Sequence, residues 1–208
     1  EPTLALLYAP EQTWPGRSEI VNNNCLVSLV TLAANVSAPD ATAESGATTA
    51  ILIATSPALP HSCLAVHPCP PDLGGVLIVT ANGVLHLEQG GKVIGTPSNG
   101  WFGKEWLGAG GGERASNSKT VREPLEGAKV VFIANDKALF FCKSGNVLEL
   151  TMKTSGRSAA SMIFKKLRNG VAGSCVERIR GSVGRFGEEG YVFVGSEVGE
   201  SALLRWEI

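Results

Sequence analysis

The 208-residue chain has few charged residues and no long apolar run. Lys, Arg, Asp and Glu make up 18% of it, below the usual quarter, while 44% of its residues are apolar. This balance excludes a disordered chain or a coiled coil, and no apolar stretch approaches the roughly 18 residues that a membrane-spanning helix needs. We therefore expect a folded chain with a buried core and no membrane contact.

Residue patterns typical of enzymes are also scarce. Three histidines occur, all between positions 61 and 86, so a Ser or Cys nucleophile has few possible bases. The nucleophile motif G-x-S-x-G is absent, and the glycine run 108–112 is not followed by the Lys-Ser/Thr of a phosphate-binding loop. The close acidic pair, Glu188 and Glu189, is flanked by glycines and predicts a solvated turn. We expect no enzymatic activity and no cofactor.

Four potential zinc ligands fall within nine residues: His61, Cys63, His67 and Cys69. Structural zinc sites usually separate two ligand pairs by a dozen or more residues, so that the chain folds back around the ion. In an extended strand, His61 and His67 would lie about 20 Å apart. We expect a strand that runs into a proline-rich turn, and no metal site.

Cysteines are odd in number, in a chain long enough to fold without disulfides. This favours free thiols in a reducing, intracellular compartment. Cys142 ends an apolar run and is expected to be buried and unreactive. The five are Cys25, Cys63, Cys69, Cys142 and Cys175.

Short apolar runs separated by turn residues predict about a dozen β-strands. Asn82-Gly83 between two runs predicts a tight hairpin, since both residues tolerate positive φ. Turn residues within 130–152 predict a three-strand meander. The runs are 3–8, 25–33, 49–55, 76–80, 84–87, 130–134, 138–142, 147–152, 161–167, 191–194 and 202–206.

No stretch keeps a 3.6-residue apolar period for three turns, so the chain is predicted to be all-β. Its strands could close a barrel, form a sandwich or make roughly three four-stranded propeller blades, and composition does not choose among these. The segment 95–112 predicts a long glycine-rich loop, extending to about residue 121, with Trp101 and Trp106 as aromatic anchors.

Positive charge is concentrated in residues 153–185, where eight basic residues face Glu177 alone, whereas residues 1–100 have a net charge of −5. Such a segment could bind nucleic-acid phosphates, bind an acidic partner protein or form a solvated surface. Strand alternation predicts Lys166 and Arg168 on one face and Leu167 on the other. The candidate contacts are Lys165, Lys166, Arg168, Arg178, Arg180 and Arg185.

Residues 1–17, E-P-T-L-A-L-L-Y-A-P-E-Q-T-W-P-G-R, form a motif too particular for a generic strand and turn. The motif resembles the largest subunit of the cleavage and polyadenylation specificity factor. Three further pieces follow in the order of that family: Leu59-Pro60 with Cys63, Gly74 to Leu77 with Asn82, and Tyr191 to Ser196 with Gly199, Ser201, Leu203 and Leu204. The last piece is shared with the damaged-DNA-binding adaptor of cullin ubiquitin ligases and with a spliceosomal scaffold.

The resemblance implies a fragment, residues 1–208, from the later half of a seven-bladed N-terminal β-propeller. Its matched residues imply structural roles: Trp14 and Pro15 anchor a turn, Gly74-Gly75 permits a close backbone approach, and Gly195 and Gly199 bracket a tight bend. Two differences stand out. The turn 66–74 is longer than in the family, and Glu197 replaces a frequent basic residue.

The implied role is a non-catalytic scaffold in the nuclear machinery for pre-mRNA 3′-end cleavage and polyadenylation. Its implied partners are a zinc-finger subunit and a WD-repeat subunit, which read the RNA, so that contact with pre-mRNA is mostly indirect. No catalytic, cofactor or metal residue is implied. The alternatives are direct RNA binding through residues 153–185, or the related scaffolds of the DNA-damage ubiquitin ligase and the spliceosome.

Overall fold

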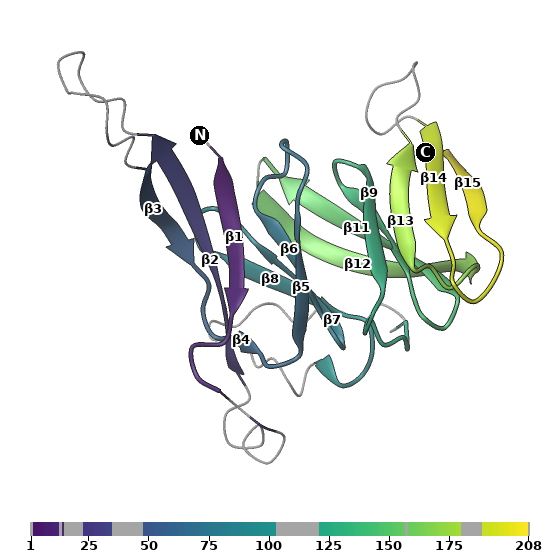
Figure 1. Cartoon of the computed structure of the whole chain (residues 1–208), viewed down its shortest axis with the longest axis horizontal. Coiled ribbons are helices and arrows are strands. Elements are labelled where there is room, and N and C mark those ends of the chain that lie inside the picture. The colour runs from purple at the N-terminus through teal and green to yellow at the C-terminus, as the bar shows by residue number, and fades with distance from the viewer. Residues whose placement is uncertain are drawn as a thin grey trace.

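Fifteen β-strands make up the elements that the structure describes (Figure 1). The structure is a computed structural model, and it describes residues 2–12, 14, 23–34, 48–102, 121–156, 158–179 and 189–207. The strands are β1 (Thr3–Tyr8), β2 (Asn23–Ala34), β3 (Thr48–Thr55), β4 (Leu59–Pro60), β5 (Cys63–Pro68), β6 (Val76–Thr80), β7 (Gly83–Leu87), β8 (Val93–Pro97), β9 (Lys129–Ala134), β10 (Lys137–Phe141), β11 (Asn146–Ser155), β12 (Ser158–Asn169), β13 (Cys175–Ile179), β14 (Glu189–Gly195) and β15 (Ala202–Glu207). No helix among these residues is long and apolar enough to cross a membrane.

The strands form four antiparallel sheets that stand side by side along the molecule (Figure 1). Sheet 1 has the order β1-β2-β3, with β4 also paired to β2. Sheet 2 is β5-β6-β7-β8, sheet 3 is β9-β10-β11-β12, and sheet 4 is β13-β14-β15. This confirms the expected all-β partial propeller with three four-stranded sheets, and it adds a three-stranded fourth sheet.

The core consists of three apolar clusters, one at each junction between neighbouring sheets. Alternate residues of a central strand enter different clusters, because successive side chains point to opposite faces of a sheet. In β6, Val76 and Ile78 pack toward sheet 1, while Leu77 and Val79 pack toward sheet 3. Sheets 2 and 3 are therefore buried on both faces, which explains why their strands appear in the sequence as continuous apolar runs.

Strand expectations from the apolar runs are confirmed, since every expected run overlaps a strand. Strands β4, β8 and β13 were not among the expected runs, because they are short or contain Gly, Pro or charged residues. Strand β5 was not among the runs either, but it was expected separately as the strand before the proline-rich turn. In particular, residues 95–97, expected to begin a loop, end β8 and pair with β7. Residues 98–102 and 121 of that expected loop are described and lie outside the strands, whereas residues 103–120 lie outside the described residues.

The β6–β7 hairpin is confirmed, but Gly83 is needed there for a different reason from the one expected. Gly83 is not among the glycines with positive φ. A Cβ on Gly83 would lie 2.5 Å from the Phe102 ring and 2.6 Å from the Thr96 carbonyl oxygen. The turn itself is closed by Thr80, whose Oγ1 lies 3.0 Å from the Gly83 amide that donates to it. Packing against the ring of Phe102 therefore selects glycine here.

Of the pair Gly74-Gly75, only Gly75 makes the close backbone approach that the resemblance implies. Their φ angles are 67° and 71°, in the left-handed region that favours glycine. A Cβ on Gly75 would lie 2.2 Å from the Leu87 carbonyl oxygen, whereas one on Gly74 would meet nothing within 4 Å. The fully buried His86 donates from Nε2 to the Gly74 carbonyl oxygen at 3.0 Å, and burial lowers its pKa. The hydrogen bond from His86 therefore holds this turn against β7.

Substitution of these glycines should separate backbone strain from steric overlap. We expect Gly75→Ala to cost more than about 3 kcal/mol, because it adds a backbone clash to left-handed strain. Gly74→Ala should cost only about 1 to 2 kcal/mol from strain. Gly90→Ala, a control in open space with no positive φ, should cost less than about 0.5 kcal/mol. Thermal unfolding of the purified protein measures the order, and equal melting points for Gly74→Ala and Gly75→Ala would contradict it.

Candidate interaction surface

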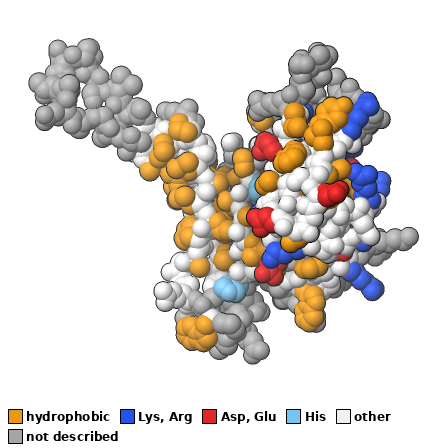
Figure 2. Space-filling model, turned by 45° about the vertical axis from the view of Figure 1, so that its right-hand side comes forward, with side chains coloured by type: hydrophobic (Ala, Val, Ile, Leu, Met, Phe, Trp, Pro, Cys, Tyr) orange, Lys and Arg blue, Asp and Glu red, His pale blue; other side chains and the backbone are white. Residues whose placement is uncertain are grey.

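The candidate basic residues lie on two different strands. Lys165, Lys166 and Arg168 are on the solvent-exposed end of β12, and Arg178 is half-buried on β13. Arg180 and Arg185 lie outside the described residues. In Figure 2 the Lys and Arg side chains lie mainly on the half of the molecule that holds the later strands.

A β-bulge separates Lys166 from Arg168. On β11, Leu148 pairs with Lys166 and its neighbour Val147 pairs with Arg168, so the register shifts between them. Leu148 belongs to the core between sheets 2 and 3, and Val147 to the core between sheets 3 and 4. Cross-strand partners point to the same face of a sheet. Lys166 therefore points to the face that packs on sheet 2, and Arg168 to the face that packs on sheet 4. The expectation that they share one face is wrong, because the extra residue breaks the alternation.

Lys166 lies close to Glu123, a residue that contacts both sheet 3 and the end of sheet 2. The Lys166 Nζ lies 4.0 Å from Glu123 Oε1, and the Glu123 side chain is 13% exposed. Ser144 Oγ donates to Glu123 Oε2 at 2.9 Å, and Asn146 Nδ2 donates to Oε1. From the other side, Ser98 Oγ donates to the Glu123 backbone oxygen at 2.7 Å. Lys166 therefore takes part in a structural contact.

Trp206 packs against Arg178 and lines the same cavity as Arg168. The Arg178 guanidinium carbon lies 5.6 Å from the centroid of the Trp206 ring, a cation–π contact. Trp206 is 8% exposed, and its indole Nε1 is buried without a hydrogen-bond partner among the described groups. Trp206 and Arg168 both line a cavity of about 330 Å³ between sheets 3 and 4. No sequence pattern indicated this grouping, which depends on the packing of two sheets.

The four potential zinc ligands are divided between the two ends of β5. At one end, His61 Nδ1 lies 3.1 Å from Asn24 Oδ1. The Cys25 thiol donates to the His61 backbone oxygen at 3.8 Å. At the other end, His67 and Cys69 line a separate cavity. No group of three or more possible metal ligands is present among the described residues, and β5 does run into a proline-rich turn as expected.

The thiols differ in environment, and none of the five is in a disulfide. Burial raises the pKa of Cys69 to about 12. Burial, together with the Glu123 carboxylate, also raises the pKa of Cys142 to about 12, and Cys142 is 1% exposed, which confirms its expected burial. A hydrogen bond from Cys63 lowers the pKa of Cys25 to about 7 against the opposing effect of burial.

Both terminal sheets expose an apolar face, part of which is visible in Figure 2. On sheet 1, every second residue of β1 points outward, and Leu6 is 49% exposed. On sheet 4, Phe193 and Leu203 are cross-strand partners with exposures of 41% and 58%. The exposed large apolar residues are Leu4, Leu6, Tyr8, Ile51, Leu52 and Ile53 on sheet 1, and Ile179, Tyr191, Phe193 and Leu203 on sheet 4.

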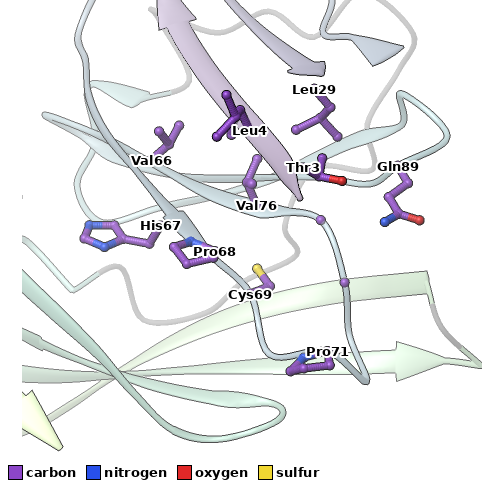
Figure 3. Close-up of a pocket in the computed structure, with 13 residues that line it drawn as sticks. Thr3, Leu4, Leu29, Val66, His67, Pro68, Cys69, Pro71, Val76 and Gln89 are labelled. Carbon is purple, nitrogen blue, oxygen red and sulfur yellow. The ribbon is translucent and has the colours of Figure 1, made fainter. Parts of the chain in front are cut away.

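A second cavity, of about 570 Å³, lies between β1 and β5 (Figure 3). Leu4 on β1 and Val66 and Val76 on sheet 2 form much of its wall. Cys69 and His67 lie at the end of β5, and burial and the nearby charge of Lys129 lower the pKa of His67. The wall of the cavity is therefore mainly apolar. The lowered pKa leaves the half-buried His67 uncharged at neutral pH.

Stacked four-stranded antiparallel sheets with two-sided cores define the chain as a partial β-propeller. No protein-family model matches it. It is 29% identical over 215 residues to "Cleavage and polyadenylation specificity factor subunit 1" of Drosophila melanogaster, covering 99% of this chain and 13% of that protein. It is 26% identical over 206 residues to the probable subunit 1 of Oryza sativa subsp. japonica, covering 99% of this chain and 13% of that protein.

A fungal relative, "Protein CFT1" of Yarrowia lipolytica, is 27% identical over 210 residues and again matches 99% of this chain and 15% of its own length. These relatives confirm the resemblance to the largest subunit of the cleavage and polyadenylation specificity factor. The chain spans about an eighth of their length, since the matched share of the fly protein is 13%.

Removal of the Glu123 carboxylate tests whether its contacts stabilise the junction of sheets 2 and 3. We expect Glu123→Ala to cost about 1 to 3 kcal/mol, because Asn146, Ser144 and Lys166 lose their common acceptor. Glu126, an exposed residue of the same segment, supplies the matched control, and Glu126→Ala should change stability by less than about 0.5 kcal/mol. Urea unfolding measures both, and equal midpoints would show that the contact contributes nothing.

Proposed function

We propose that the chain is part of a non-catalytic scaffold subunit of the nuclear machinery that cleaves and polyadenylates pre-mRNA. One observation carries the proposal: nearly the whole chain, 99%, is similar to proteins of fly and rice whose names place them in this process. In this proposal, residues 1–208 form part of one N-terminal propeller of a longer protein.

The packing of the sheets limits where partner subunits could bind. Both faces of sheets 2 and 3 are used for internal packing. The outer faces of sheets 1 and 4 carry the exposed large apolar side chains Leu6 and Leu203, and in the proposed longer protein they would pack against neighbouring blades of the same propeller. Contacts with partner subunits would then be made by strand edges and loops. The proposed partners are a zinc-finger subunit and a WD-repeat subunit of the same complex.

Co-purification of the tagged, full-length parent protein from nuclear extract tests this proposal. We expect mass spectrometry at moderate salt to recover the polyadenylation endonuclease, a zinc-finger subunit and a WD-repeat subunit. The same tag on an unrelated nuclear protein is the control. Recovery of cullin ligase components or spliceosomal subunits in place of these would assign the chain to one of the related scaffolds and would overturn the proposal.

Direct RNA binding is a second candidate, favoured by the exposure of Lys165 and Arg168 at the same end of β12. If these residues contact RNA phosphates, the affinity of the full-length protein for single-stranded RNA should fall steeply between 50 and 200 mM salt, by about tenfold or more. The double variant Lys165→Gln/Arg168→Gln should weaken binding and flatten this dependence.

The variant leaves Lys166 in place, because its contact with Glu123 is structural. The scaffold proposal expects weak affinity for free RNA and little effect of the double variant. Lys153→Gln, a change at an exposed lysine on β11, provides the matched control for a simple loss of positive charge. An unchanged salt dependence in the double variant would remove these residues from the list of RNA contacts.

A further inference from the structure

Cys25 and Cys63 lie at the junction of sheets 1 and 2, where strands β2, β4 and β5 come together (Figure 1). Cys25 is on β2, opposite Leu59 of β4. Cys63 begins β5 and is separated from β4 only by His61 and Ser62. Both cysteine side chains pack in the apolar cluster between the two sheets. The two residues are far apart in the sequence, so only the fold brings them together.

The two thiols are in direct contact. The thiol and the backbone amide of Cys63 both donate hydrogen bonds to the sulfur of Cys25. The same sulfur lies 3.8 Å from the His61 backbone oxygen and 3.8 Å from Asn24 Oδ1. A sulfur atom that accepts a hydrogen bond from the amide of another cysteine must also lie near the Cα and Cβ atoms of that cysteine. This proximity is what a disulfide requires, since its Cβ atoms are about 3.8 Å apart.

The Cys25 thiol differs in reactivity from the other buried thiols. The hydrogen bonds from Cys63 lower the pKa of Cys25 to about 7, so about half of it is the reactive thiolate at neutral pH. Cys69 and Cys142 share the core between sheets 2 and 3, but burial raises the pKa of each to about 12. At neutral pH only about one molecule in 10⁵ then has either of them as a thiolate.

Access to the pair is available from the side of Cys63. Cys25 is buried, with 7% of its surface exposed, whereas Cys63 is half-buried. A small oxidant or reductant can therefore reach the sulfur of Cys63, and the adjacent sulfur of Cys25 completes the reaction. Neither residue is in a disulfide in this structure. Disulfides that form in reducing compartments are mostly transient and redox-sensing, which fits a pair held ready as two thiols.

We propose that Cys25 and Cys63 form a reversible disulfide when the protein meets a peroxide, and that this modification links sheet 1 covalently to sheet 2. With hydrogen peroxide, both S–H bonds and the O–O bond break, one S–S bond forms and two water molecules leave. The two sulfur atoms are oxidised, and the peroxide takes up their two electrons and two protons. A thiol reductant reverses the reaction by thiol–disulfide exchange. The linked form holds the junction of β2 and β5 against local opening.

Peptide mapping of the purified full-length protein tests the proposal without any variant. The reduced protein is treated with hydrogen peroxide, its remaining thiols are blocked with N-ethylmaleimide under denaturing conditions, and unreduced peptides are identified by mass spectrometry. We expect the linked Cys25–Cys63 peptides to be at least about tenfold more abundant than any other linkage of either cysteine, and to disappear after treatment with dithiothreitol. Cys69 and Cys142 should be recovered as blocked thiols. Recovery of Cys25 and Cys63 as blocked thiols, as separate sulfinic acids or in linkages to other cysteines would overturn the proposal.

Two variants show whether the pair reacts directly. Cys63→Ser keeps a side-chain hydrogen-bond donor but removes the second sulfur, so Cys25 should form no linkage. Cys175→Ser removes an exposed thiol on β13 and is the matched control, with as much Cys25–Cys63 linkage as the unchanged protein. Loss of the linkage in Cys175→Ser would show that another thiol forms it by exchange, and would contradict direct formation. The result is independent of the polyadenylation role, because a linked pair with a failed co-purification would reject only that role.

Discussion

Two-sided burial of β-sheets is the constraint on which the rest of this structure depends. A sheet in the middle of the stack has no solvent face, so each of its strands must present apolar residues in both directions. Strand β6 meets this requirement with five buried residues in succession. The three apolar clusters follow directly, since each one is filled by alternate residues from the two sheets that it joins.

Close packing between sheets also explains the least replaceable residues. At Gly75 and Gly83 the neighbouring atoms approach so closely that a methyl group does not fit. His86, fully buried between β7 and the turn at Gly74, must remain neutral and donate one hydrogen bond. Polar groups that remain inside such a stack need a specific partner, because they have lost their water. The contacts of Glu123 supply such partners at the junction of sheets 2 and 3.

Where the stacking stops, apolar surface and open strand edges remain. Sheets 1 and 4 expose Leu6 and Phe193 on their outer faces, and the two cavities lie beside the edge strands β1 and β15. The Trp206 indole beside the smaller cavity has no hydrogen-bond partner among the described groups. In the proposed longer protein, these outer faces are the ones on which neighbouring blades of the same propeller would pack.

The sequence by itself determined where most strands lie, because an apolar run bounded by turn residues is a local signal, as in β6 and β10. It also determined the similarity to the polyadenylation factor through a particular opening motif. Only the tertiary structure decided that Lys166 and Arg168 leave opposite faces, because the bulge depends on how β12 packs against β11. It likewise decided that Glu123 joins two sheets and that Arg178 packs against Trp206, which lines the same cavity as Arg168. These groupings bring together residues distant in the sequence, and no local pattern records which sheet faces which.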